Sequence, residues 1–103
     1  MSQNARLQLV ECPRDAMQGW PHFIPTADKV EYLNALLKVG FDVIDFGSFV
    51  SPKAIPQLAD TKDVLKGLDI SNTSSKLLAI IANTRGAEDA IAYEQISYLG
   101  FPF

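Results

Sequence analysis

Charged and polar side chains follow four predicted strands, and their types favour chemistry on an anionic oxygen. The groups are Arg14, Asp15 and Gln18 after the first strand; Asp45, Gly47 and Ser48 at the end of the second; Asn83, Thr84 and Arg85 after the third; and Gly100, Phe101, Pro102 and Phe103 after the fourth. Ligands of parallel α/β folds gather at the carboxyl ends of strands. Asp15 can supply one carboxylate to Mg²⁺ or Mn²⁺, which favour oxygen ligands. Arg14 can stabilise an anionic oxygen that develops on a substrate carbonyl, and Asp45 is the one evident base.

Each of these residues also has a purely structural interpretation. Arg14 and Asp15 can form a salt bridge within the loop, which contributes little to stability. Asp45 ends an apolar strand, and a structural partner such as Arg14 suits its carboxylate as well as a catalytic role does. Ser48 can simply shape the turn that follows.

Four further residues have structural interpretations that we favour over ligand binding. Asn83 and Thr84 precede a predicted helix and can cap it. Cys12 stands at the end of a strand, where we expect a small buried hydrophobic side chain. His22 lies in a proline-containing loop and is expected at the surface.

The elements that must position these residues alternate between strand and helix. Strands are predicted over residues 7–12, 41–46, 77–82 and 96–99, and helices over residues 26–39, 60–68 and 87–93. The third strand is apolar at every position, as expected when both faces of a parallel sheet are buried. Repeated strand–helix units imply parallel strands joined by right-handed crossovers.

The first predicted helix has the clearest boundaries. Thr26 can cap its start, and Gly40 can stop it, as glycine commonly does just past a helix C-terminus. Apolar residues from Val30 to Leu37 recur on one face, which places Lys29 with the other charged residues elsewhere on the helix. Residues 16–27 before it contain one glycine and two prolines and are predicted to form a long loop.

Two α/β folds suit this order of elements: half of a barrel, or a small doubly wound sheet. A doubly wound nucleotide-binding fold requires glycines directly after its first strand. Here residues 13–18 contain none, and they offer an arginine and a carboxylate instead of a phosphate cradle.

Length and composition narrow the classes of function. Of the 103 residues in the chain, 48% are hydrophobic, which argues against disorder. The length allows one domain. It excludes a complete barrel of eight strand–helix units, which needs roughly 250 residues. The net charge of −3 and the absence of a basic run argue against nucleic-acid binding. No apolar run approaches the roughly 20 residues of a membrane helix. One cysteine, one histidine and no signal peptide predict a cytoplasmic protein without a zinc site of its own.

Three sequence segments resemble the hydroxymethylglutaryl-CoA lyase family. Residues 10–18, Val-Glu-Cys-Pro-Arg-Asp-Ala-Met-Gln, resemble the opening motif E-x-x-P-R-D-x-x-Q, which a wider superfamily of metal-dependent barrel lyases and condensing enzymes shares in part. Residues 48–53, Ser-Phe-Val-Ser-Pro-Lys, followed by Pro56-Gln57 and Val64-Leu65-Lys66-Gly67, are more specific to the lyases. Residues 82–86, Ala-Asn-Thr-Arg-Gly, are similar to the end of the family's third strand.

The resemblance implies the N-terminal half of a (β/α)8 TIM barrel, with residues 1–103 forming a partial lyase domain of about four of the eight strands. It implies metal-dependent retro-Claisen cleavage of 3-hydroxy-3-methylglutaryl-CoA to acetyl-CoA and acetoacetate, used in leucine breakdown and ketone-body formation. In the family pattern Asp15 would be a metal ligand. Arg14 would stabilise the enolate of the product, and Gln18 and Ser48 would line the site.

The chain also departs from the family pattern. Asp45 stands where the family often has glutamate, so its charge is retracted by one methylene. The family often has glycine-leucine in place of Ala16-Met17. Its remaining metal ligands, a paired histidine motif and an asparagine, lie on later strands, as does a mobile-loop cysteine. Cys12 and His22 match none of these positions.

Three hypotheses follow for function. The first is the N-terminal part of such a lyase, with a divalent cation and an acyl-CoA substrate as partners, inactive as this chain alone. The second is a related barrel aldolase or acyl-CoA condensing enzyme, against which the segment 48–53 speaks. The third is a non-catalytic half-barrel that assembles with itself, because its sheet edges would be open to pairing. None of the three involves nucleic acid or a membrane.

Overall fold

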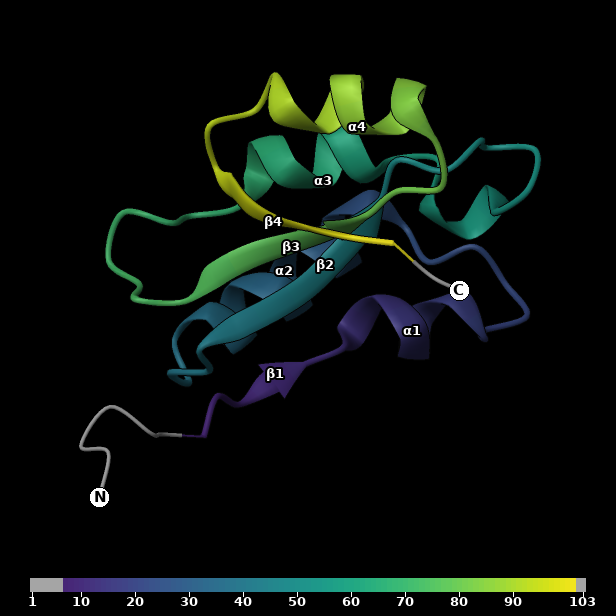
Figure 1. Ribbon diagram of the computed structural model, residues 1–103. Helices are drawn as coiled ribbons and strands as arrows, with labels where there is room; N and C mark the ends of the chain where they lie inside the picture. Colours follow the sequence, from purple (N-terminus) through teal and green to yellow (C-terminus); the bar gives the residue numbers. More distant parts are fainter. Residues whose placement is uncertain (1–6, 102–103) are drawn as a thin grey trace.

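The computed structural model describes residues 7–101 as a parallel sheet with helices between its strands (Figure 1). The strands are β1 (Val10–Glu11), β2 (Val43–Ser48), β3 (Lys76–Ile80) and β4 (Ile96–Gly100), and the helices are α1 (Pro13–Gln18), α2 (Thr26–Leu37), η1 (Pro56–Leu58), α3 (Thr61–Gly67) and α4 (Thr84–Ile91). All three strand pairs are parallel, in the order β1-β2-β3-β4. This sequential order confirms the half-barrel alternative, since a doubly wound sheet reverses its order at a switch point.

The main core lies between the two central strands and helices α2 and α3. Ile44 and Phe46 of β2 and Leu77 and Ala79 of β3 face the helices and are at most 1% exposed. They pack against Leu33, Leu37, Val64 and Leu65. Burial of these apolar side chains is the main favourable term in the free energy of folding, at about 25 cal/mol per Å² of apolar surface removed from water.

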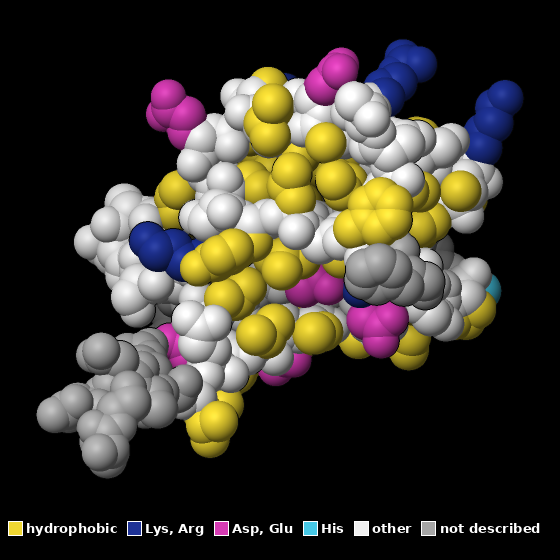
Figure 2. Space-filling model, viewed as in Figure 1, with side chains coloured by type: hydrophobic (Ala, Val, Ile, Leu, Met, Phe, Trp, Pro, Cys, Tyr) yellow, Lys and Arg dark blue, Asp and Glu magenta, His cyan; other side chains and the backbone are white. Residues whose placement is uncertain are grey.

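The other face of the sheet is less covered than its apolar sequence predicts. Side chains of β3 alternate between buried and partly exposed, so the expectation of two fully buried faces is wrong for residues 7–101. Tyr98 is 45% exposed and Val10 is 51% exposed. Figure 2 shows hydrophobic side chains spread over this side of the molecule. Within the described residues β1 and β4 are the edge strands of the sheet.

Helix α1 is the largest correction to the predicted elements. Residues 16–27 are predicted as a loop, whereas a helix begins at Pro13 and runs to Gln18. Proline suits the first helical position because its fixed φ fits and its missing N–H would have no partner there. Asp15 in the first turn adds a favourable interaction with the helix dipole.

Helix α2 begins differently from the prediction. Thr26 is its first residue, and Pro25 precedes it without a side-chain cap. The Thr26 hydroxyl instead donates to Asp60 Oδ2 at 2.6 Å. The helix ends at Leu37, and Gly40 follows with φ of 102°, a conformation that favours glycine.

Lys29 is buried, although its charge predicts exposure. Its side chain is 1% exposed, with Nζ 2.7 Å from Asp60 Oδ1 and 4.2 Å from the centre of the Phe23 ring. Nζ also donates to the Gln57 carbonyl oxygen. These contacts tie the start of α2 to the segment before α3.

Gln57 fastens the loop between α1 and α2. Its Oε1 accepts from the Ile24 N–H at 2.8 Å, and its Nε2 donates to the His22 carbonyl at 2.7 Å. Trp20 and Phe23 in this loop are nevertheless 60% and 53% exposed. The loop therefore keeps a fixed path and presents aromatic side chains at the surface.

None of the helices formed by residues 7–101 is long and apolar enough to cross a membrane.

Candidate functional site

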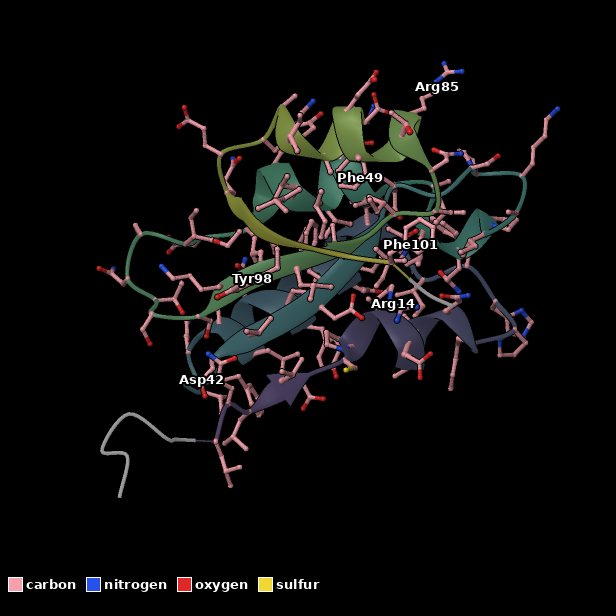
Figure 3. All side chains as sticks on the ribbon, in the orientation of Figure 1. Arg14, Asp42, Phe49, Arg85, Tyr98 and Phe101 are labelled. Carbon is pink, nitrogen blue, oxygen red and sulfur yellow. The ribbon has the colours of Figure 1, made fainter. Side chains whose placement is uncertain are left out.

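Arg14 and Gln18 of α1 meet Asp45 in the middle of β2, and Figure 3 shows where Arg14 lies. Arg14 Nε lies 3.0 Å from Asp45 Oδ1 and 2.9 Å from Oδ2, and Nη2 lies 2.9 Å from Oδ2. Arg14 Nη1 donates to Gln18 Oε1 at 2.8 Å, one helical turn further along α1. The structural pairing of Arg14 with Asp45 is thereby confirmed.

The pair fixes the guanidinium while leaving part of it free. An arginine has five N–H donors, and the contacts above use Nε and one side of each terminal nitrogen. The side chains are 17% exposed for Arg14 and 6% for Asp45. A positively charged donor set, largely withdrawn from water and held in one orientation, suits the stabilisation of a developing oxyanion.

The pKa of Asp45 lies above its ordinary value. Burial is the largest cause, because removal from water disfavours the carboxylate, and the nearby charge of Asp15 adds to it. The hydrogen bond and charge of Arg14 act in the opposite direction. The raised pKa means that the stabilising contribution of Asp45 falls as pH rises from the ordinary aspartate value through the raised one.

We expect Arg14→Gln to raise the pKa of Asp45 further. The substitution removes the hydrogen bonds and positive charge that favour the carboxylate, while burial persists. NMR titration of the Asp45 carboxyl carbon measures the midpoint in both proteins. Lys38→Gln, at an exposed position outside this site, is the control and should leave the midpoint unchanged. An unchanged or lowered midpoint in Arg14→Gln would contradict the assignment of Arg14 as the partner that lowers it.

Asp15 is exposed, and its charge acts on Asp45 without direct pairing to Arg14. Among the described residues it forms no ion pair, so the alternative of an Arg14–Asp15 salt bridge is wrong. Within residues 7–101 no three His, Cys, Asp or Glu side chains converge as a metal site would require. Asp15 as a metal ligand therefore stays a prediction, and the described residues do not by themselves fit a complete divalent-cation site.

Two side chains set aside from the site lie at the surface. His22 is exposed, as predicted. Cys12 is also exposed, so its prediction as a buried hydrophobic residue is wrong. Strand β1 ends at Glu11, and Cys12 is left at the junction before α1. Partial burial is the largest cause that raises the pKa of its thiol, and the charge of Asp45 contributes.

Ser48 is buried at the end of β2 and shapes the chain after it. Its Oγ accepts from the Val50 N–H at 3.0 Å, and its own N–H donates to Thr61 Oγ1 at 3.1 Å. The structural interpretation of Ser48 is thus confirmed, and its role in binding substrate stays a prediction. Gly47 beside it approaches Thr61 so closely that an added Cβ would lie 2.7 Å from Thr61 Cγ2.

The strand β2 changes register between these two groups. Asp45 pairs with Leu78, whereas Gly47 pairs with Ala79, so Phe46 is the extra residue of a bulge. Bulges re-aim side chains and are common beside functional sites. Here the bulge separates the part of β2 that carries Asp45 from the part that carries Ser48.

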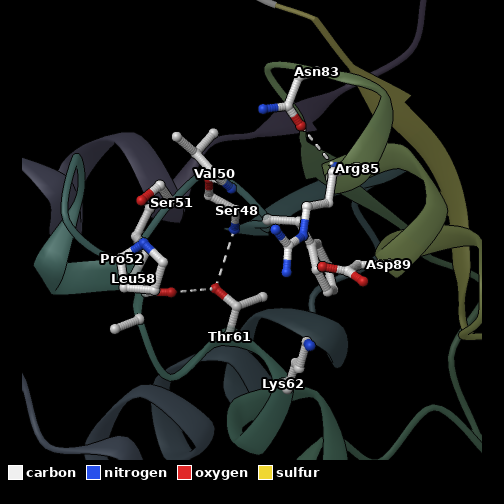
Figure 4. A pocket seen from close by; sticks show the side chains of 13 residues that line it. Ser48, Val50, Ser51, Pro52, Leu58, Thr61, Lys62, Asn83, Arg85 and Asp89 are labelled. Carbon is white, nitrogen blue, oxygen red and sulfur yellow. Dashed lines mark hydrogen bonds between the residues drawn. The ribbon is translucent and has the colours of Figure 1, made fainter.

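A pocket of about 520 Å³ lies beyond Ser48, between the segment after β2 and the start of α4 (Figure 4). Its wall includes Ser48, Ser51, Thr61, Lys62, Asn83, Arg85 and Asp89. Asn83 caps α4 through Oδ1, which accepts from the Gly86 N–H at 2.8 Å, as the capping interpretation predicts.

The candidate residues at the end of the fourth strand lie outside this pocket. Gly100 packs on Ile80, and Phe101 is 56% exposed. Residues 102–103 lie outside the described residues.

The buried cluster around Lys29 is what sequence reasoning missed near this site. Lys29, Leu33 and Leu37 are spaced four residues apart, so Lys29 lies on the same face of α2 as two core leucines. That spacing was the available signal. Its partner Asp60 lies 31 residues further along the chain, and no local sequence pattern indicates that the two side chains pair.

Comparison with known proteins relates the chain to one group of enzymes. No family profile matches it. The chain is 42% identical over 79 residues to the hydroxymethylglutaryl-CoA lyase of Bacillus subtilis. The aligned segment covers 77% of this chain and 26% of that enzyme. It is 39% identical over 88 residues to the mitochondrial hydroxymethylglutaryl-CoA lyase of Rattus norvegicus, covering 84% of this chain and 27% of the enzyme.

Solved structures give the same relation. The lyase of Pseudomonas aeruginosa aligns with a TM-score of 0.83 at 33% identity, over 93% of this chain and 32% of the other. The lyase of Acinetobacter baumannii, solved with coenzyme A and 3-methylmalate, aligns with a TM-score of 0.84 at 36% identity, over 98% and 33%. The chain thus spans between a quarter and a third of these enzymes. Over most of its own length it is homologous to the hydroxymethylglutaryl-CoA lyases, as a partial lyase-like domain that corresponds to the N-terminal third of their barrel.

Proposed function

We propose that this chain forms part of the active site of a hydroxymethylglutaryl-CoA lyase, the part in which Arg14 stabilises the reacting oxygen of the substrate. The observation that carries the proposal is the Arg14–Asp45 pair, held on a sheet that aligns with a lyase solved with coenzyme A. The proposed reaction is cleavage of 3-hydroxy-3-methylglutaryl-CoA to acetyl-CoA and acetoacetate, and the proposed partner is therefore an acyl-CoA. A cytoplasmic location stays a prediction from the sequence.

The reaction needs a stabilised oxyanion, and Arg14 supplies the donors. A base takes the proton of the 3-hydroxyl, and its oxygen forms the ketone carbonyl of acetoacetate as the C2–C3 bond breaks. The electron pair of that bond passes into the thioester carbonyl. The resulting enolate of acetyl-CoA then takes a proton at C2. We assign the enolate oxygen to the unused N–H groups of Arg14, which bind it more strongly than the neutral carbonyl.

Asp45 and Gln18 have supporting parts in this scheme. Asp45 orients the guanidinium through Nε and Nη2, and Gln18 holds Nη1 from the other side. The raised pKa of Asp45 also suits a group that exchanges protons with a substrate, and Asp45 is the one evident base that the sequence offers at this site. Ser48 is proposed to line the substrate site.

The family resemblance implies Mg²⁺ or Mn²⁺, which would supply a positive charge for substrate oxygens. The described residues offer Asp15 as one carboxylate ligand and no complete cluster. Tight binding would require further ligands from outside residues 7–101. We therefore expect the 103-residue chain to bind these ions weakly and to lack lyase activity by itself.

A chimera with a related enzyme tests the proposal. In the chimera, the part of this chain that matches the Bacillus subtilis lyase, 42% identical over 79 residues, replaces the corresponding segment of that enzyme. We expect the chimera to release acetoacetate from 3-hydroxy-3-methylglutaryl-CoA with added Mg²⁺ or Mn²⁺, and the isolated 103-residue chain to release none. The native Bacillus enzyme is the positive control. A chimera that folds as shown by circular dichroism, yet cleaves nothing, would reject the proposed function.

Self-assembly remains the alternative proposal for the same fold. Edge strands β1 and β4 expose main-chain groups that another sheet could pair with. Sedimentation of the 103-residue chain distinguishes the two: a defined oligomer favours assembly, whereas a monomer favours a lyase portion.

A further inference from the structure

The pocket beyond Ser48 is a polar region whose wall contains neither Arg14 nor Asp45, although it shares Ser48 with the proposed substrate site. Arg14 belongs to α1 and Arg85 to the first turn of α4, and the two labelled side chains lie well apart in Figure 3. The pocket opens between the segment after β2 and α4, at the carboxyl ends of β2 and β3. This is the end of a parallel sheet at which ligands bind.

Several polar side chains on the pocket wall accept hydrogen bonds from the backbone and retain unused O–H or N–H donors. Ser48 Oγ and Ser51 Oγ each accept a backbone N–H, so each has its hydroxyl proton to offer. Asn83 uses Oδ1 to cap α4 and keeps its amide protons. Thr61 already both accepts and donates within the protein. A wall that presents donors and few acceptors selects an anion.

Two cationic side chains strengthen that preference. Lys62 from α3 and Arg85 from α4 both line the pocket, against the single carboxylate of Asp89 (Figure 4). Within residues 7–101 neither cation forms an ion pair, in contrast to Arg14 and Lys29. The local charge is therefore positive in a chain whose formal net charge is −3.

The wall is also rigid. An added Cβ on Gly86 would lie 2.9 Å from the Phe49 carbonyl oxygen, which shows how closely α4 packs on the segment after β2. The Asn83 cap and the Thr61 hydrogen bonds fix the two sides of the pocket. The Ser48 and Asn83 side chains are held by hydrogen bonds within the protein, which reduces the conformational entropy that they lose when an anion binds.

We propose that this pocket binds a phosphoryl group. Two cations with fixed hydroxyl and amide donors match the charge and the several acceptor oxygens of a phosphate monoester. The phosphate can be free, or it can be the 3′-phosphate of coenzyme A. The second source rests on the proposed lyase function, whereas binding of the phosphoryl group itself does not.

NMR titration of the labelled 103-residue chain tests the proposal and separates the two sources. Inorganic phosphate, coenzyme A and dephospho-coenzyme A are added in turn, with sodium chloride at matched ionic strength as the blank. We expect the amide signals of Ser48, Arg85 and Gly86 to move with phosphate and not with chloride. Tighter binding of coenzyme A than of its dephospho form and of inorganic phosphate identifies the nucleotide as the source. Equal binding of inorganic phosphate and coenzyme A identifies a free phosphate site.

Variants show whether the two cations are responsible. The double variant Lys62→Gln/Arg85→Gln should weaken phosphate binding by about tenfold or more, since charge-assisted hydrogen bonds are lost. Lys66→Gln, on the same helix but outside the pocket wall, is the matched control and should change affinity by less than about twofold. Asp89→Asn should tighten binding. The proposal is overturned if these amides do not move, or if the double variant binds like the parent. Neither result depends on cleavage by the chimera.

Discussion

In the Bacillus chimera, Arg14→Gln is expected to lower kcat by about 10²–10³-fold, the effect of removing an oxyanion donor. The loss should fall on kcat more than on KM, because the guanidinium interacts more strongly with the enolate than with the ground-state carbonyl. Steady-state release of acetoacetate measures both constants. Arg14→Lys keeps a charge but cannot form the paired contacts to Asp45, so we expect an intermediate rate.

Two controls separate chemistry from folding in this experiment. Lys38→Gln removes a charge at an exposed position and should leave kcat within about twofold. Thermal unfolding of each chimera checks that the variants remain folded under assay conditions. If Arg14→Gln is folded and its kcat stays within about threefold of the parent chimera, Arg14 does not stabilise the reacting oxygen.

Asp60→Ala is expected to lower the free energy of unfolding by about 3–5 kcal/mol. The substitution leaves the ammonium of Lys29 in a site where it is 1% exposed and without its anionic partner. It also removes the acceptor of the Thr26 hydroxyl. Equilibrium unfolding of the 103-residue chain in urea, followed by circular dichroism, measures the change.

The control and the rescue for this prediction come from the same region. Asp63→Ala removes an exposed carboxylate from the first turn of α3 and should cost about 1 kcal/mol or less. Lys29→Met/Asp60→Leu replaces both charges by apolar groups, and we expect it to recover most of the stability lost by Asp60→Ala. A cost below about 1 kcal/mol for Asp60→Ala would show that the buried charge is not important for folding.

The sequence predicted those parts of the fold that periodicity and composition determine. The alternation of strands and helices and the apolar face of α2 follow from local patterns of apolar residues, whereas the half-barrel order of the strands is implied by the family resemblance. The prediction lacks α1 because a proline directly after the strand predicted over residues 7–12 is compatible with the end of a strand and equally with the first position of a helix, which Pro13 occupies.

The candidate site was predictable by residue and only partly by contact. Arg14, Gln18 and Asp45 were identified from their places after predicted strands, and the Arg14–Asp45 contact was one of two pairings left open. The burial of Lys29 was not predicted, because it depends on Asp60, which is 31 residues away along the chain. No local pattern reveals a partner at that separation.

The two members of the Arg14–Asp45 pair lie on elements with different numbers of neighbouring strands in the sheet. Asp45 stands on β2, which has a hydrogen-bonded neighbour on both sides, whereas Arg14 follows β1, an edge strand of two residues. Local openings in proteins begin in such weakly supported elements and reach the central strands last. Amide protons of β1 and α1 should therefore exchange with solvent well before those of β2. Arg14 is carried by one of the first segments to open, and the carboxylate that pairs with it by one of the last.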